Sequence, residues 1–228
     1  MARIRGIILL LQFTITVAIT VVAMYLFRNH THKVIKTWMK IQIKLLGIKI
    51  QSVGTLDDSC DLVLMNHQSL LDIIIMEHIH NRDLAWVAKK EISDLFFFGH
   101  IIKAPRMISI DRENKAGLIH LFKEVKDRLD KGRPIAMFPE GTRSDGKKML
   151  KFKAGAKMVA NKYKLKVQPV IMINTRNIVD SKTLKATPGT VKVIYLEPVQ
   201  ADKTTSWFED TEEKMKEVFD KEIKSHVS

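Results

Sequence analysis

An uncharged apolar run near the N-terminus constrains this chain more than any other feature. The run extends from Ile7 to Phe27 (IILLLQFTITVAITVVAMYLF). As an α-helix it would be about 32 Å long, enough to cross a hydrocarbon core of about 30 Å. Arg3 and Arg5 precede it as in a secretory signal peptide, but the run is long and no A-x-A-like cleavage site follows it. The sequence therefore predicts an uncleaved membrane anchor, with a tilted or partly inserted helix as the alternative to a full span.

A lysine stripe and an apolar stripe follow this run, both at helical spacing. The lysine stripe consists of Lys33, Lys36, Lys40 and Lys44. The apolar stripe includes Val34, Trp38, Ile41 and Leu45. This pattern predicts an interfacial helix over residues 33–49 that lays its lysines on anionic headgroups and holds Trp38 at the membrane boundary. The alternative is an amphipathic helix packed on the protein body. We predict a membrane-anchoring region over residues 1–50 and a folded domain over residues 51–228.

The charge balance calls for an anionic partner. The chain has 38 basic and 25 acidic residues, a formal net charge of +13, and its first 56 residues contain no acidic residue. A phospholipid surface, a phosphorylated small molecule and nucleic acid all fit such a charge, but the apolar run and the lack of an aromatic-basic recognition motif disfavour nucleic acid. With Cys60 as the single cysteine and no H-x3-H or H-E-x-x-H arrangement, neither a disulfide framework nor a metal site is expected.

From Asp61 onward, short apolar runs alternate with amphipathic helical patterns. The predicted strands are LVLM, LAWVA, MISID, PIAMF, VQPVIMI and VKVIYL. Five helices are predicted. One begins near Leu70, and the others cover EISDLFFF, Lys115 to Leu129, AGAKMVANKY and the C-terminal segment TTSWFEDTEEKMKEVFDKEIKSHV. This alternation predicts an α/β fold whose central sheet, mostly parallel or mixed, is flanked by helices.

The segment NHQSLLD places His67 five positions before Asp72. One interpretation is structural, because Ser69 and Asp72 form the S-x-x-D pattern of a capping box at a helix start. The other is chemical, because His67 backed by a carboxylate has the makings of a general base. Both interpretations put His67 in a loop and Asp72 in the first helical turn, so this stretch alone does not separate them.

A second informative segment, FPEGTRS (Phe138 to Ser144), follows the predicted strand PIAMF. Loops that leave strand ends are where α/β folds hold ligands. Its continuation nearly matches a phosphate-binding P-loop, but Lys148 stands where that motif needs a serine or threonine. A nucleotide site of that kind is therefore excluded.

Together, NHQSLLD and FPEGTRS, about seventy residues apart, resemble the glycerolipid acyltransferase family, the lysophosphatidate (1-acylglycerol-3-phosphate) acyltransferases. The intervening blocks AKKEI, FFG and MISIDR and the later blocks MLKFKAGA and VQPVIM also look like blocks of that family. Each block is weak alone, but the ordered set, over about residues 60–173, is specific. The resemblance extends the α/β prediction to an acyltransferase domain over residues 51–228.

The resemblance implies transfer of a fatty acyl group from a thioester, on acyl carrier protein or coenzyme A, to the sn-2 hydroxyl of 1-acylglycerol 3-phosphate, giving phosphatidic acid without a further cofactor. His67 would be the general base, oriented by Asp72. The predicted groups that bind the acceptor's phosphate are Arg112, Arg143 and Lys89. Backbone N–H groups of the turn Glu140-Gly141-Thr142 are the predicted oxyanion donors. The Glu140 side chain is expected to hold an arginine or an acceptor hydroxyl.

Other functions stay open at this point. Within the same fold the acceptor could be glycerol 3-phosphate or another lysolipid, including a lyso-amino-acid lipid. A thioesterase using the same histidine, or a noncatalytic basic membrane-binding module, would belong to different classes. If the apolar run spans, the basic residues from Arg28 through Lys49 predict, by the positive-inside rule, a catalytic domain on the cytoplasmic side.

Overall fold

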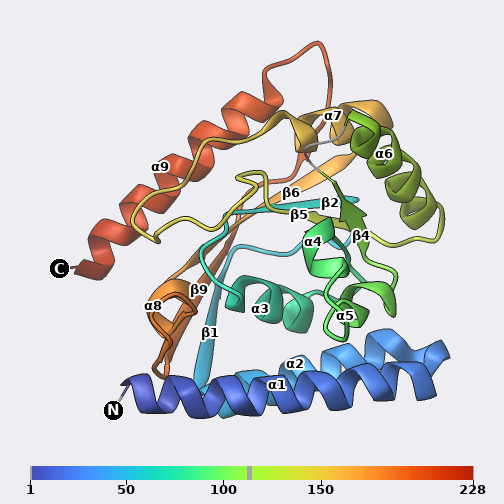
Figure 1. The fold of residues 1–228 in the computed structure, drawn as a ribbon. Coiled ribbons are helices and arrows are strands. Elements are labelled where there is room, and N and C mark those ends of the chain that lie inside the picture. The colour runs from blue at the N-terminus through green and yellow to red at the C-terminus, as the bar shows by residue number, and fades with distance from the viewer. Residues whose placement is uncertain (1, 112–114, 228) are drawn as a thin grey trace.

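The computed structural model describes residues 2–111 and 115–227. At its centre lies a mixed sheet in the order β1-β9-β6-β2-β5-β3-β4, with β10 also paired to β6 (Figure 1). The strands are β1 (Ile48–Val53), β2 (Leu62–Met65), β3 (Ala85–Lys89), β4 (Ile108–Ile110), β5 (Ile135–Met137), β6 (Lys166–Ile173), β9 (Gly189–Tyr195) and β10 (Val199–Gln200). Strands β6, β2, β5, β3 and β4 are mutually parallel, whereas β9 and β10 run antiparallel to β6. The predicted α/β fold is confirmed.

Alternate residues of the strands face two separate cores, as the period of two in a strand requires. On β2, Val63 and Met65 join the core shared with the N-terminal helices and α3 (Leu71–Ile79), which α8 (Thr175–Ile178) also borders. Leu62 and Leu64 join the core on the other face. That face is covered by α6 (Lys115–Asp130), α7 (Ala154–Tyr163) and α9 (Trp207–Val227) (Figure 1). Helix α9 is the predicted C-terminal amphipathic helix.

Helices α1 (Ala2–Leu26) and α2 (Thr31–Leu46) form a hairpin beneath the sheet, joined by the short turn η1 (Arg28–His30) (Figure 1). Helix α1 is long and apolar enough to cross a membrane by length and composition. It nevertheless lies along the body, where Gly6 packs so closely that a β-carbon there would come within 2.0 Å of the Leu184 carbonyl oxygen. Leu184 precedes β8 (Lys185–Ala186), which pairs with β7 (Val179–Asp180) in a small hairpin.

Helix α2 packs its apolar stripe on the body. Trp38 is buried in the core with Ile35, Met39 and Ile43, so the prediction that it lies at the membrane boundary is wrong. The reason is that a helix with one apolar face can bury it against α3 as readily as in a bilayer. Strand β1 begins at Ile48, so the predicted boundary at residue 50 falls inside a strand.

The predicted helix through EISDLFFF is also wrong. Its helical part ends after one turn, α4 (Lys90–Ser93), and a new turn, α5 (His100–Lys103), begins after Gly99. A β-carbon at Gly99 would lie 2.1 Å from the Ser93 carbonyl oxygen. The chain therefore folds back on itself at Gly99, and Leu95 to Phe98 form a turn instead of a helical stripe.

Candidate active site

The parallel strands bring the predicted site residues to one edge of the sheet, because the carboxyl ends of parallel strands lie together. His67 follows β2, the segment Phe138 to Arg143 follows β5, and Lys89 ends β3. Thr175 follows β6 at the same edge. Arg112, which follows β4 in the sequence, lies outside the described residues.

His67 and Asp72 form a hydrogen-bonded pair. The distance from His67 Nδ1 to Asp72 Oδ2 is 2.8 Å, and Asp72 is fully buried. The same Oδ2 accepts the backbone N–H groups of Gln68 at 2.7 Å and Ser69 at 2.8 Å, while Oδ1 accepts the Thr175 hydroxyl at 2.6 Å. The bond from Ser69 N–H to Asp72 is half of a capping box. The Asp72 carboxylate therefore makes both the contact with the His67 ring and the capping contact with Ser69.

A ring contact with Phe138 also fixes the orientation of the His67 imidazole. Its ring stacks on Phe138, with centroids 3.8 Å apart and planes 12° from parallel. Since Nδ1 is bonded to Asp72, Nε2 is the ring nitrogen left to act on a ligand. The His67 side chain is 15% exposed and lines a cavity, so a bound molecule can reach the ring.

Glu140 has a different role from the one the sequence suggests. It is buried, and its two carboxylate oxygens accept the backbone N–H groups of His67 and Leu150, each at 2.6 Å. Burial raises the pKa of Glu140 to about 7, against the opposing effect of these two donors. The prediction that Glu140 holds an arginine or an acceptor hydroxyl is therefore wrong, because both oxygens already bind the backbone on either side of the site.

The FPEG segment forms a tight turn, as proline at the second and glycine at the fourth position of a β-turn favour. The Gly141 N–H donates to the Phe138 carbonyl at 3.0 Å, and Gly141 adopts a φ of 74°. Because this N–H is engaged in the turn, it does not fit its predicted role as an oxyanion donor. Thr142 and Arg143 are exposed and line the cavity, and Arg143 Nη1 donates to Ser181 Oγ at 3.0 Å.

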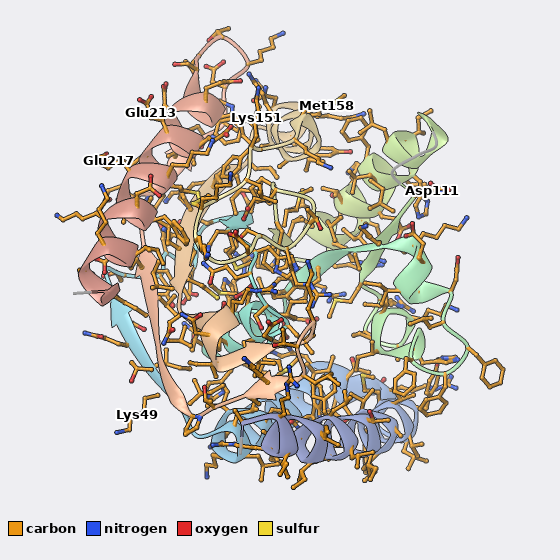
Figure 2. All side chains as sticks on the ribbon, turned by 60° about the vertical axis from the view of Figure 1, so that its left-hand side comes forward. Lys49, Asp111, Lys151, Met158, Glu213 and Glu217 are labelled. Carbon is orange, nitrogen blue, oxygen red and sulfur yellow. The ribbon has the colours of Figure 1, made fainter. Side chains whose placement is uncertain are left out.

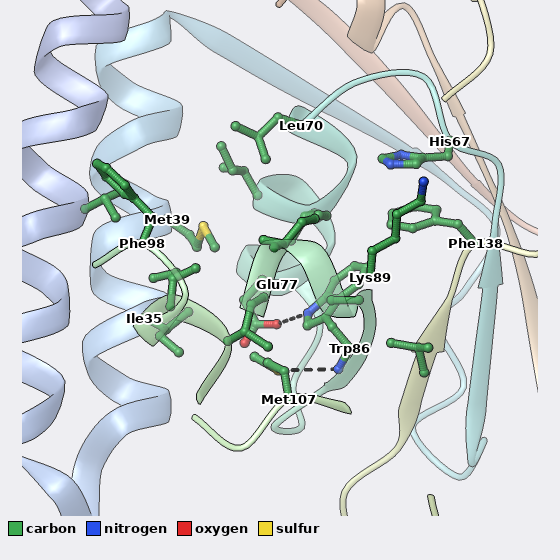
Figure 3. A pocket seen from close by; sticks show the side chains of 18 of the residues that line it. Ile35, Met39, His67, Leu70, Glu77, Trp86, Lys89, Phe98, Met107 and Phe138 are labelled. Atoms are coloured by element: carbon green, nitrogen blue, oxygen red, sulfur yellow. Dashed lines mark hydrogen bonds between the residues drawn. The ribbon is translucent and has the colours of Figure 1, made fainter. Parts of the chain in front are cut away.

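An apolar cavity of about 430 Å³ extends from this polar edge toward the N-terminal helices. Figure 3 shows His67 and Phe138 at one side and Ile35, Met39 and Phe98 at the other. Lys89 extends toward His67 in the same view. A cavity of this size, apolar over most of its length with a few polar groups at one end, is typical of a site for an amphiphilic small molecule. The structure thus gathers His67, Lys89, Gly141, Thr142 and Arg143 at one end of it.

A charged group that the sequence did not reveal lies beside the apolar part of the cavity. The buried carboxylate of Glu77 accepts the Trp86 indole N–H at 2.7 Å and lies 3.6 Å from His32 Nδ1. His32 Nδ1 also lies 3.3 Å from Asp83. Asp83 and Glu77 raise the pKa of His32 to about 9. The protonated imidazole of His32 is the cation between these two carboxylates, and the same three side chains lie close enough together to hold a metal ion in its place.

This ion cluster predicts a pH-dependent stability. The pKa of His32 is about 9 in the folded protein and 6.5 ordinarily. Protonated His32 therefore stabilises the folded protein fully below pH 6.5, and this stabilisation is lost as the pH rises through about 9. The shift corresponds to up to about 3 kcal/mol of unfolding free energy. Replacing His32 by glutamine should therefore lower the free energy of unfolding at pH 6.5 much more than at pH 10. Denaturant titrations at both values measure this, with exposed His120→Gln as the control. An equal loss at both pH values would contradict the assignment.

The sequence analysis assigned no role to three residues that contact the predicted site residues. Thr175 bonds Asp72, Phe138 stacks on His67, and Ser181 bonds Arg143. Thr175 had a usable signal, because it stands just after VQPVIMI, which was predicted to be a strand. Ser181 had none, since the small β7–β8 hairpin lacks the alternating pattern of a strand.

Comparison with known proteins agrees with this geometry. Residues 55–173 match the model of the family described as Acyltransferase. The chain is 38% identical to the 1-acyl-sn-glycerol-3-phosphate acyltransferase of Helicobacter pylori, over 95% of this chain and 93% of that protein. It is 32% identical to the lyso-ornithine lipid O-acyltransferase of Brucella abortus, over 60% of this chain and 54% of that protein.

Among solved structures, the fold matches the crystal structure of the 1-acyl-sn-glycerophosphate (LPA) acyltransferase PlsC from Thermotoga maritima. The TM-score is 0.76 at 26% identity, and the match covers 100% of this chain and 98% of that one. With the family match over half of its length and a relative of 38% identity along almost all of it, this chain belongs to the acyltransferase family.

Proposed function

We propose that this enzyme transfers a fatty acyl group from an acyl thioester to the sn-2 hydroxyl of 1-acylglycerol 3-phosphate, giving phosphatidic acid for phospholipid synthesis. The observation that carries the proposal is the hydrogen-bonded pair of His67 and Asp72 at the polar end of an apolar cavity. The relatives in Helicobacter pylori and Thermotoga maritima, which are named for this reaction, support the choice of acceptor.

In the proposed mechanism, His67 Nε2 takes the proton of the acceptor hydroxyl as its oxygen attacks the thioester carbonyl. Asp72 orients the ring through Nδ1 and stabilises the imidazolium that forms. The tetrahedral intermediate then expels the thiolate, which is a good leaving group and takes the proton back from the His67 imidazolium, so direct transfer needs no acyl-enzyme and no cofactor besides the thioester. Of the predicted oxyanion donors, the Thr142 N–H remains the best candidate, since Gly141 is engaged with Phe138.

Cations at the cavity's polar end fit the acceptor's phosphate. Arg143 is exposed there, and Lys89 extends toward His67 (Figure 3). A guanidinium can bind phosphate with two parallel hydrogen bonds. We propose the same phosphate-binding role for Arg112, as the sequence predicts.

Membrane association is part of the proposal. The outward face of α1 presents Ile4, Ile8, Leu11, Ile15, Ile19, Val22 and Leu26, each at least 53% exposed. A contiguous apolar face of this kind marks a lipid or protein contact, and the acceptor is itself a lipid. We propose that α1 is embedded in the bilayer with the catalytic domain on the cytoplasmic side, where thioester donors are available.

The test is an assay of the purified protein with acyl carrier protein and coenzyme A thioesters. Each donor is offered with lysophosphatidate, glycerol 3-phosphate, lysophosphatidylcholine and a lyso-ornithine lipid, the last because of the Brucella relative. Thiol release and lipid product are followed together. Phosphatidic acid formed from lysophosphatidate, well above every other product, is the expected result. Thiol release without lipid product would replace the proposal by a thioesterase, and product only from the ornithine lipid would change the acceptor.

Arg143→Ala should raise the KM for lysophosphatidate about 10- to 100-fold, because a charge-assisted hydrogen bond contributes about 1.5 to 3 kcal/mol. The slow hydrolysis of the thioester alone should change far less, since it uses no phosphate. Steady-state kinetics against both substrates measure the difference. Lys147→Ala, an exposed charge on the same loop that does not line the cavity, is the control. An equal loss of transfer and hydrolysis would argue for a structural or oxyanion role.

A further inference from the structure

The turn between α4 and α5 exposes an unusual number of large apolar side chains. Phe96 is 97% exposed, and Leu95, Phe97 and Phe98 are 51%, 36% and 40% exposed. Ile92, at 43%, extends the patch into α4. Most exposed apolar residues stand singly, whereas five adjacent ones form a contiguous surface of the kind that marks an interaction site. We call Ile92 and Leu95 to Phe98 the aromatic turn.

The aromatic turn lies beside the end of α1. Tyr25 on α1 and His100 on α5 are joined by a hydrogen bond of 2.5 Å and an edge-on ring contact at 5.4 Å. Figure 1 shows α5 directly above this end of α1. Leu26, the last residue of α1, and Phe27, which follows it, are 74% and 57% exposed. The apolar surface of α1 therefore continues across Tyr25 and His100 to the aromatic turn.

The cavity lies between the inward face of α1 and the aromatic turn. Its lining includes Phe13 and Val17 from α1, together with Ile92, Phe98 and Ile101 from the aromatic turn and α5. Figure 3 shows Phe98 at the end of the cavity near the N-terminal helices. An apolar chain that entered between α1 and the aromatic turn would meet apolar side chains along its path to His67.

We propose that the aromatic turn is a second membrane-contacting element, which inserts into the bilayer beside α1 so that lipid chains reach the cavity between the two. The occupant is a phospholipid bilayer and not a protein partner, because the surface is continuous with the proposed lipid-facing side of α1. Phenylalanine and leucine suit this position, since they are large, apolar residues of the kind that membrane-surface segments bury at the boundary between headgroups and acyl chains. The inference rests on the proposed membrane association of α1 but not on the identity of the acceptor.

Fluorescence tests the insertion without any assay of turnover. In Phe96→Trp the added indole should be quenched by brominated phospholipid and protected from aqueous iodide when phosphatidylglycerol/phosphatidylcholine vesicles are added. The three native tryptophans, all buried, supply the baseline from the unmodified protein. The matched control is Met158→Trp, because Met158 is 41% exposed on α7, at the opposite end of the molecule from α1 (Figure 2). Its indole should stay accessible to iodide.

Binding provides the second measurement. Phe96→Asp should raise the lipid concentration for half-maximal vesicle binding about tenfold or more, as expected when one buried phenylalanine is lost. Met158→Asp introduces the same charge and should leave binding unchanged. Both variants should keep the activity of the unmodified protein on detergent-dispersed substrate.

The outcomes are separable. Quenching of Phe96→Trp by iodide with vesicles bound, or unchanged binding of Phe96→Asp, overturns the inference while the reaction and α1 binding stand. Failure of the unmodified protein to bind vesicles overturns both the inference and the proposed membrane association. Absence of acyl transfer, with the fluorescence result as expected, overturns only the proposed reaction.

Discussion

Replacing His67 by alanine is expected to reduce acyl transfer by about 10²- to 10⁴-fold, the range usual for loss of a general base. An alcohol is a poor nucleophile, and the structure places no other imidazole of the described residues at the polar end of the cavity. The measurement is kcat with lysophosphatidate and a saturating thioester donor. The KM values should change little, because His67 acts on the proton and not on either substrate's charged group.

Folding of the His67→Ala protein is the necessary check. The side chain is partly exposed, and its backbone N–H, which binds Glu140, survives the substitution. The unfolding midpoint should therefore stay close to that of the unmodified protein. His120→Ala, at an exposed position on α6, controls for loss of any imidazole. Near-normal turnover in a folded His67→Ala protein would leave Asp72 with only its capping role.

Asp72→Asn is expected to lower kcat by a similar factor, about 10²- to 10⁴-fold, because an amide can bind the ring in the wrong tautomer and gives no charge to stabilise the imidazolium. Unlike His67, Asp72 also holds the start of α3 and the Thr175 hydroxyl. Some loss of stability should accompany the loss of activity. The two effects are measured as kcat and as the free energy of unfolding.

Thr175→Val separates the two roles of Asp72. It removes one donor to the buried carboxylate but leaves the charge and the contact with His67 in place. It should destabilise the protein by about 1 to 3 kcal/mol, as unpaired buried groups do, with a far smaller change in kcat. If Thr175→Val and Asp72→Asn lowered kcat equally, the charge of Asp72 would not be what the reaction needs.

The sequence was informative where one local rule decided the structure. The continuous apolar run from Leu62 to Met65 predicted the strand, and the end of the strand fixed where His67 would emerge. Contacts between loops far apart in the chain could not be predicted from the sequence. Nothing in the spacing of Glu140 says that its carboxylate would bind the His67 backbone, because that contact joins two loops 73 positions apart.

The N-terminal half of the chain shows a second limit of prediction from sequence. The stripe of α2 is equally compatible with a lipid surface and with a protein core, so periodicity alone could not place Trp38. Similarly, the apolar content of EISDLFFF suggested a helix, but α4 ends at Ser93 and the chain folds back so that Gly99 packs against the Ser93 carbonyl. For Trp38 the deciding partner lay elsewhere in the fold, whereas Gly99 packs against a residue six positions before it.

The close contact between Gly6 and Leu184 has a consequence for the proposed membrane association. A domain on a flexible tether samples many heights and tilts above a membrane, whereas one whose lipid-facing helix is packed backbone to backbone against it moves as a single rigid body. Its cavity would then keep one fixed depth relative to the lipid plane. If α1 is embedded in the bilayer as proposed, encounter with a lipid acceptor becomes a two-dimensional search, governed by lateral diffusion within one leaflet, and the product is left in that same leaflet.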